Sequence, residues 1–368
     1  MQEFELTGDA LTGVMPQLHS AATFAALPTK VRLGRKRSEK LCTAPKFADF
    51  VDLEALPIPA TVDYTPKAMA SLSRVYLNDQ YGCCVIAGKF HNVGVWTGND
   101  TSTCITGSDN EVLAMYRGIC GPGDNGCVIT QVLDVFRDTG LQIGGVMHKI
   151  DGYVSVDHTK RDLVRAAIYL FGGCTIGINF PEEWLSKAVW DVTSSRIVGG
   201  HDVSPVKCKF LGATDDGVFV SSWGRVYQMT WAAFLSPKWV EEFYAMLSPD
   251  WYNADKIAPN GFDIAGLRKA LTQLGAGQVP DVAPPTPPNP TPTTWTIKTP
   301  GAVTITGTGV KPLVGVPSDP VKPCGCNDRS GVIDPAIIAK ILQILSSLPP
   351  GVLLQLLAVL QQWFAPKK

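Results

Sequence analysis

A polar turn that ends in two cysteines leads directly into a long apolar stretch. The turn runs from Asn78 through Cys83 to Cys84, and residues 85–96 are apolar and compatible with a helix. A sulfur at the first turn of a helix faces the positive end of the helix dipole and unpaired backbone N–H groups, which favour the thiolate over the thiol. Cys84 is therefore a candidate nucleophile. The alternative is a packing role, because free cysteines are among the most buried residues.

Two later segments carry polar residues that a thiol-dependent enzyme needs. His201 follows two glycines, and residues 206–210 alternate between apolar and polar, which predicts a half-buried strand with a histidine near its start. A short apolar run at 218–220 ends in the sequence Ser-Ser-Trp-Gly at 221–224. The chain order is therefore cysteine, histidine, and then a polar residue beside a tryptophan.

This order resembles that of the papain-like cysteine peptidases. The family carries an oxyanion-hole amide side chain six residues before its nucleophile, as Asn78 stands six before Cys84. Its histidine follows a glycine, as His201 does, and its Asn-Ser-Trp-Gly sequence aligns with residues 221–224. The resemblance covers residues 58–250 and looks closest to divergent bacterial and phage members, whose Asn-Asp-x-x-Gly-x-Cys sequence ends at Cys84.

The resemblance implies an α+β fold of two lobes, one helical and one rich in strands, and a site that needs no cofactor. Cys84 would attack a peptide or related amide carbonyl, and His201 would accept and return the proton. The side chain of Asn78 would stabilise the oxyanion together with the Cys84 N–H, and Ser221 would orient His201. Cys84 is favoured over Cys83 because it keeps the family's distance from Asn78.

Two departures from the family pattern leave a second function open. Val85 stands where the family has a tryptophan, and Ser221 replaces the orienting asparagine with a shorter side chain. The chain therefore also fits an inactive papain-like scaffold that serves as a structural or binding component of a larger assembly, such as a phage particle. His91 is not an alternative base, because two helical turns place it about 10 Å from Cys84.

Composition excludes some function classes. The net charge of −1 predicts no nucleic-acid partner, and the short basic run is expected to be a solvated arm; it consists of Arg32, Arg35, Lys36, Arg37 and Lys40. No metal is expected, because Cys324 and Cys326 have no second pair of ligands nearby. Cys120 and Cys127 flank a turn-rich loop that a disulfide could close.

The cellular location cannot be inferred from the sequence. Residues 1–13 are acidic and lack a basic start with an apolar core, so no N-terminal signal peptide is expected. No segment is predicted to span a membrane. Three histidines have no context that links them to a cysteine and are expected at the surface: His19, His148 and His158.

The chain divides into five segments by composition. Residues 1–57 form an irregular extension comparable to a propeptide, and residues 58–275 the papain-like domain. A proline-rich linker is expected at 276–294, a small β segment at 295–330, and an apolar helical hairpin or assembly tail at 331–368. The tail predicts a protein partner or self-association, with binding to a membrane surface as the less favoured alternative.

Besides the stretch at 85–96, helices are expected at five places in the main domain. A capping box of Ser108 and Glu111 predicts the start of one of them. By periodicity the helices span residues 109–119, 128–139, 161–171, 230–247 and 263–274.

Overall fold

The computed structural model describes residues 1–15, 19–20, 23, 27–38, 44–51, 53–54, 56–251, 294–298 and 304–308. The chain divides into two compact units, Met1–Val310 and Lys311–Lys368, and all described residues belong to the first. Several predictions fall outside the described residues: the helix at 263–274, the linker before Thr294, the tail at 331–368, and Cys324 and Cys326.

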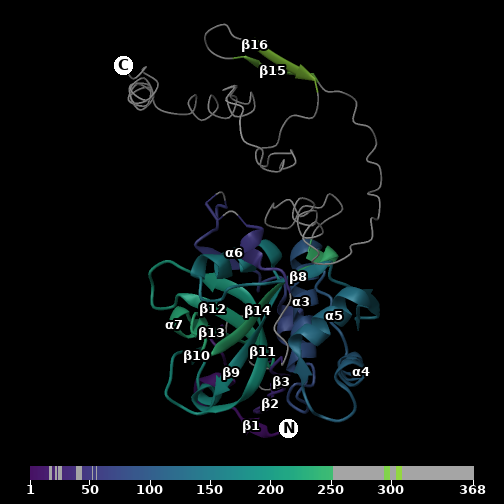
Figure 1. Ribbon diagram of the computed structural model, residues 1–368, viewed down its shortest axis with the longest axis vertical. Coiled ribbons are helices and arrows are strands. Elements are labelled where there is room, and N and C mark those ends of the chain that lie inside the picture. The colour runs from purple at the N-terminus through teal and green to yellow at the C-terminus, as the bar shows by residue number, and fades with distance from the viewer. Residues whose placement is uncertain are drawn as a thin grey trace. The chain divides into compact units, whose positions relative to one another are not determined.

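An eight-stranded sheet forms the centre of the domain (Figure 1). Its order is β10-β13-β12-β11-β9-β14-β8, and β4 also pairs with β11. The pairings are antiparallel except that of β10 with β13. The strands are β4 (Thr61–Asp63), β8 (Gly152–Ser155), β9 (Cys174–Pro181), β10 (Val189–Trp190), β11 (Ile197–Lys209), β12 (Gly217–Ser222), β13 (Arg225–Thr230) and β14 (Val240–Leu247).

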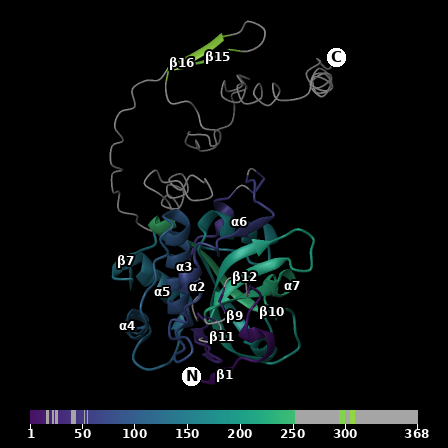
Figure 2. The same ribbon diagram turned by 180° about the vertical axis from the view of Figure 1, so that it is seen from behind.

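A helical part lies beside this sheet, as the views from front and back show (Figures 1 and 2). The helical part consists of α3 (Cys84–Asp100), α4 (Asp109–Cys120) and α5 (Ile129–Asp138). The remaining helices are α2 (Met69–Leu72), α6 (Arg161–Phe171) and α7 (Trp231–Phe234), with 3-10 turns η1 (Gly8–Leu11), η3 (Phe47–Asp49), η4 (Glu182–Ser186) and η5 (Pro249–Trp251). The expected α+β fold, with a helical part followed by a strand-rich part, is confirmed.

Short strand pairs complete the described structure. They are β1 (Glu3–Glu5) with β2 (Lys30–Arg32), β3 (Arg35–Lys36) with β5 (Cys127–Val128), β6 (Leu141–Ile143) with β7 (Val146–His148), and β15 (Thr294–Lys298) with β16 (Thr304–Thr308). The last pair is an antiparallel hairpin that begins at the last residue of the expected linker, Thr294, and otherwise lies in the segment where a small β structure is expected. Only β3 and β5 run parallel among these four pairs.

Local sequence signals explain where the helices begin and end. Ser108 accepts a hydrogen bond from the Glu111 backbone N–H at 3.3 Å, while its own N–H donates to the Glu111 carboxylate at 2.7 Å, so the capping box is confirmed. Helix α6 ends at Gly172, whose φ of 58° lies in the left-handed region that glycine adopts without steric cost. Helix α3 is buried from Cys84 to Gly98, because it packs between the sheet and the other helices.

The helix expected at 230–247 is wrong beyond its first turn. Helix α7 ends at Phe234, and β14 follows as an inner strand between β9 and β8. Both faces of an inner strand are covered, so after Glu241 and Glu242 the residues Phe243–Leu247 are all buried and show no alternation with polar side chains. Periodicity alone cannot distinguish such a strand from a buried helix.

The environment of His148 differs from the predicted one, whereas that of Cys120 and Cys127 agrees with it. His148 is not at the surface, because only 4% of it is exposed and its Nδ1 lies 2.7 Å from the Asp250 carboxylate. Cys120 and Cys127 form the disulfide for which the loop has room. Within the described residues, no helix is both long and apolar enough to cross a membrane.

Candidate active site

Cys84 occupies the first position of α3, and Cys83 is the residue before the helix. The Cys84 thiol faces the backbone N–H groups of Asp202 and Gly34. Burial and the nearby Asp202 carboxylate raise the pKa of Cys84 to about 12, although the two N–H groups act in the opposite direction. In this state the sulfur is a protonated thiol at neutral pH.

His201 lies within β11, and the described structure encloses its ring completely. Its Nε2 lies 2.7 Å from the Ser222 hydroxyl, while Nδ1 has no hydrogen-bond partner among the described residues. The Trp223 indole stacks on the imidazole at 4.4 Å between ring centroids, and Phe180 meets it edge-on at 5.9 Å. Burial and the charge of Arg35 lower the pKa of His201 to about 3, so the imidazole is neutral.

The hydroxyl that contacts His201 belongs to Ser222 and not to Ser221. Ser221 pairs with Ser204 across the β11–β12 ladder, and its hydroxyl has no partner among the described residues. Neighbouring residues of a strand point to opposite faces of the sheet. The side chain placed to orient His201 is therefore Ser222, one residue after the predicted Ser221.

Asn78 lies in the turn before Cys84, but its side-chain amide already donates two hydrogen bonds. Its Nδ2 donates to the carbonyls of Tyr81 at 3.0 Å and Arg32 at 3.2 Å, while its backbone carbonyl accepts from the Arg32 N–H at 3.0 Å. The predicted oxyanion donor thus binds the N-terminal extension. Cys84 contacts the same extension two residues further on, at Gly34.

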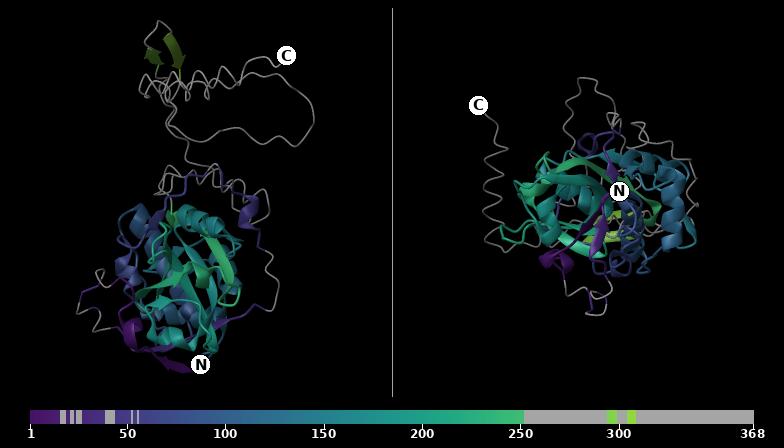
Figure 3. Two further views of the ribbon diagram at one scale, coloured as in Figure 1. Left: turned by 90° about the vertical axis from the view of Figure 1, so that its left-hand side faces the viewer. Right: turned by 90° about the horizontal axis from the view of Figure 1, so that it is seen from below.

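A short stretch of the extension, Leu33–Arg35, covers the site and is called the covering segment below. The Gly34 carbonyl accepts a hydrogen bond from the Cys127 N–H at 2.9 Å. A Cβ placed on Gly34 would lie only 1.8 Å from the Gly82 carbonyl oxygen, and one on Gly199 only 2.8 Å from Leu33. Seen from below, the N-terminal part of the chain runs between the helices and the sheet (Figure 3). The fit leaves no room for a side chain at Gly34.

Arg35 contradicts the expectation of a solvated basic arm. Its side chain is only 2% exposed, and its terminal nitrogens pair with Glu241 at 2.6 Å and Glu242 at 2.8 Å. Arg37 does remain largely exposed, with one contact to Glu241 at 2.7 Å.

A buried charge pair links the two elements that carry the candidate catalytic residues. Lys89 of α3 lies 2.6 Å from the Thr175 hydroxyl and 3.3 Å from the Asp202 carboxylate, and both charged side chains are inaccessible to solvent. Thr175 also donates to Asp202 at 2.5 Å. Burial raises the pKa of Asp202 to about 6, against the lowering effect of Lys89 and Thr175.

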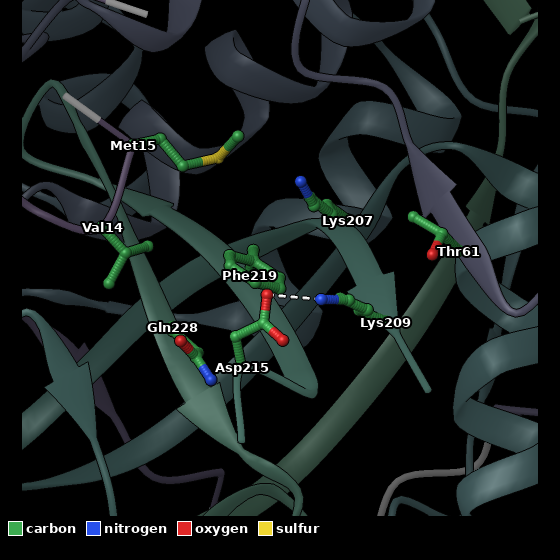
Figure 4. Close-up of a pocket in the computed structure, with 8 residues that line it drawn as sticks. All are labelled: Val14, Met15, Thr61, Lys207, Lys209, Asp215, Phe219 and Gln228. Atoms are coloured by element: carbon green, nitrogen blue, oxygen red, sulfur yellow. Dashed lines mark hydrogen bonds and ion pairs between the residues drawn. The ribbon is translucent and has the colours of Figure 1, made fainter. Parts of the chain in front are cut away.

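A separate cavity of about 290 Å³ opens on β11, β12 and β13 (Figure 4). In Figure 4 the Lys209 ammonium meets the Asp215 carboxylate, while Lys207 forms an ion pair with Asp63 at 2.8 Å. None of its lining residues belongs to the group around Cys84; they are Val14, Met15, Thr61, Lys207, Lys209, Asp215, Phe219 and Gln228.

A comparison with solved structures finds cysteine proteases at low sequence identity. Xylellain, a cysteine protease from Xylella fastidiosa, is 15% identical, with a TM-score of 0.48 over 59% of this chain and 96% of its own. Procathepsin B S9 from Trypanosoma congolense is 11% identical, with a TM-score of 0.46 over 59% of this chain and 86% of its own. No protein-family model matches the chain, and no curated protein matches its sequence.

Sequence reasoning missed five residues around Cys84 and His201: Lys89, Asp202, Ser222, Trp223 and Arg35. Trp223 and Ser222 lay inside a sequence already singled out, and strand alternation could have separated Ser222 from Ser221. A lysine inside the apolar stretch after Cys84 was a signal for a buried partner, because lysine is rarely buried unpaired. Nothing local marked Arg35, since its carboxylate partners lie more than 200 residues away in the chain.

Proposed function

We propose that the chain is a papain-like cysteine hydrolase of peptide or related amide bonds, and that the covering segment keeps it latent. One observation carries this proposal. The Cys84 thiol, at the start of α3, faces the backbone N–H of Asp202, which is the residue after His201. Ser222 and Trp223 hold the His201 ring in place. A nucleophile, a base and a group that orients the base are the parts that thiol catalysis requires.

The chemistry follows from these positions. The Cys84 sulfur attacks the carbonyl carbon while His201 takes the thiol proton, and the oxyanion forms near the Cys84 N–H and the Asn78 amide. Collapse breaks the C–N bond, and His201 gives its proton to the departing amine. Water, deprotonated by His201, then hydrolyses the thioester and restores the thiol. Ser222 accepts from Nε2–H in the tautomer that leaves the Nδ1 lone pair free to take the proton.

Burial accounts for latency. Both pKa values are displaced in the direction that stabilises the neutral thiol and the neutral imidazole, and desolvation is the largest cause in each case. Removal of the covering segment would admit water and release the Asn78 amide from the Arg32 carbonyl. The pKa of Cys84 would then fall and that of His201 would rise, which favours an ion pair of thiolate and imidazolium.

The substitution Gly34→Leu tests this proposal on the full chain. A leucine cannot fit against the Gly82 carbonyl, so it should displace the covering segment without changing any candidate catalytic residue. The control is Gly118→Leu, because a Cβ placed on Gly118 would have no neighbouring atom within 4 Å. We expect Gly34→Leu to increase iodoacetamide labelling at Cys84 by about tenfold or more at pH 7, and to hydrolyse a peptide library.

The His201→Ala variant in the Gly34→Leu background separates reactivity from mere exposure. If His201 activates Cys84, its removal should abolish both hydrolysis and the fast labelling below pH 8. Labelling that is equally fast without His201, together with no hydrolysis by Gly34→Leu, would instead support the inactive scaffold.

A further inference from the structure

We propose that Lys89 is a positioning residue for the thiol chemistry at Cys84 and that it acts through Asp202. Its ammonium neutralises a carboxylate that would otherwise oppose a thiolate at Cys84. The inference rests on the proposed function for its role in catalysis, but the ionisation of Cys84 can be measured without turnover.

The fold brings the Asp202 carboxylate to the helical turn that follows Cys84. Gly88 lies one turn after Cys84 on the same face of α3, because residues four apart are neighbours on a helix. A Cβ placed on Gly88 would lie only 2.6 Å from Asp202 Oδ2, so the carboxylate packs directly against the glycine backbone. The Asp202 backbone N–H meanwhile faces the Cys84 thiol. Both the backbone and the carboxylate of Asp202 are therefore close to the sulfur.

This carboxylate opposes ionisation of the sulfur. A thiolate at Cys84 adds a second negative charge in a site that excludes water, where like charges repel strongly. When Cys84 gives its proton to His201, the S–H bond breaks and an N–H bond forms, which leaves a thiolate and an imidazolium. With Lys89 charged, the four groups carry no net charge before or after this transfer.

Lys89 supplies the cation that this arrangement requires. Its Nζ lies 3.3 Å from Asp202 Oδ2 and 2.6 Å from the Thr175 hydroxyl, and neither charged side chain is accessible to solvent. Burial lowers the pKa of Lys89, while the charges of Asp202 and Cys84 act in the opposite direction. The ammonium therefore interacts with the sulfur as well as with the carboxylate.

Stability alone does not account for such a pair. Apolar residues of similar volume often stabilise a core at least as well as a buried ion pair does. Ionisable groups with perturbed pKa values concentrate instead at functional sites. The position of this pair beside the candidate nucleophile favours an electrostatic role.

The other charged groups that face this cluster compensate each other. Glu242 of β14 lies near Asp202, and Arg35 of the covering segment lies near Cys84. These two side chains form an ion pair at 2.8 Å. Both are kept in every variant below, so a change in the ionisation of Cys84 reports on Lys89 and Asp202.

The test is the rate of iodoacetamide labelling at Cys84 in the full chain from about pH 5 to 10, read by mass spectrometry. Cys104, a free and partly exposed cysteine, is the internal reference for general loosening of the domain. Each variant is made in the wild-type and in the Gly34→Leu background, so the result does not depend on displacement of the covering segment.

The two charges should act in opposite directions. At pH 7, Asp202→Asn should raise the ratio of Cys84 to Cys104 labelling about tenfold, because the opposing carboxylate is gone. Lys89→Met should lower the ratio about tenfold, because the carboxylate is left uncompensated. Lys207→Met, the same change in the ion pair with Asp63, is the matched control and should leave the ratio unchanged. A purely structural role would expose Cys84 in both variants and raise both ratios.

A shift of the same sign in Asp202→Asn and Lys89→Met, or no shift in either, would overturn the inference. If Lys89→Met alone does not fold, the double variant decides, because no buried charge remains in it. Adding Lys89→Met to Asp202→Asn should cancel the faster labelling. Acceleration that persists in the double variant would mean that Lys89 does not act on Cys84.

Turnover distinguishes this inference from the proposed function. If Gly34→Leu hydrolyses peptides but the two charge variants shift Cys84 labelling alike, the hydrolase stands and the role of Lys89 is wrong. If the shifts have opposite signs but no peptide is cleaved, the role of Lys89 in the ionisation of Cys84 stands and the hydrolase is wrong.

Discussion

Ser221 and Ser222 are neighbours on β12, yet only one hydroxyl reaches the candidate base. Ser222 Oγ lies 2.7 Å from His201 Nε2, and the Ser221 hydroxyl has no partner among the described residues. The pair offers a matched test, since the two substitutions remove the same atom from adjacent positions. The shorter reach of serine relative to asparagine is no obstacle at position 222, because the imidazole and the hydroxyl are already within hydrogen-bond distance.

We predict that Ser222→Ala, in the Gly34→Leu background, slows peptide hydrolysis and Cys84 labelling by roughly tenfold. The lost hydrogen bond is worth about 1 kcal/mol, and a buried Nε2 is left unpaired. Ser221→Ala is the control and should change both rates less than twofold. The pH dependence of labelling reports the imidazole directly. Equal effects of the two substitutions would show that Ser222 does not orient His201.

At the scale of elements, Lys89 and Asp202 join the helix that carries Cys84 to the strand that carries His201. Both side chains are inaccessible to solvent, and Thr175 completes their hydrogen bonding. A buried charge pair does not necessarily stabilise a protein relative to apolar residues, but the loss of one partner leaves the other charge uncompensated. The pair therefore constrains how α3 and β11 meet.

Lys89→Met should destabilise the domain by about 3 to 5 kcal/mol, because Asp202 would lose its buried cation. Adding Asp202→Asn to Lys89→Met should recover most of this loss, because no buried charge remains. Urea denaturation of the wild type, both single variants and the double variant forms a complete cycle. Additive losses in the double variant would contradict a direct interaction between the two side chains.

The elements also show how far the sequence could predict the structure. Local signals located α4, α5 and α6 to within a residue, because caps, glycine stops and helical periodicity act within one turn. Helix α3 begins where it was expected but continues four residues beyond the predicted end, to Asp100. Strand β14 was missed, because an inner strand shows no alternation. In the candidate site, chain order and spacing singled out Cys84, His201 and Asn78, and their catalytic roles stay predictions. Arg35 and its carboxylates required the fold, since distant segments meet there.

At the scale of the whole molecule, the described residues at the start of the extension pack against the folded domain. The backbone carbonyls of Leu11 and Ala10 accept hydrogen bonds from Arg225 at 2.7 Å and Tyr227 at 2.9 Å, and Leu6 is only 2% exposed. Loss of these contacts would leave buried donors unsatisfied. Displacing the covering segment alone, while residues 1–15 stay packed, therefore opens the site without breaking these contacts.

Burial of histidines ties the stability of the folded domain to pH. Desolvation lowers the pKa of His91 and of His201 to about 3 each, below the ordinary value near 6.5. Below pH 6.5 the histidines of the unfolded chain therefore bind protons that the folded chain does not bind, and the stability of the fold decreases as the pH falls towards 3. Asp202 acts in the opposite direction between about pH 6 and 4, because its raised pKa lets the folded state take up a proton first.

His91→Gln isolates one of these contributions, because His91 lies on α3 against the Tyr76 ring, away from the Ser222 contact. Each buried histidine should lower the free energy of unfolding by about 1.4 kcal/mol per pH unit below 6.5. Between pH 6.5 and 5 the wild type should therefore lose about 2 kcal/mol more than His91→Gln, whatever the other titrating groups contribute to both. Urea denaturation at the two pH values measures this difference. If the two proteins lose the same stability, His91 titrates alike in the folded and unfolded states, and its burial does not control the acid sensitivity of the fold.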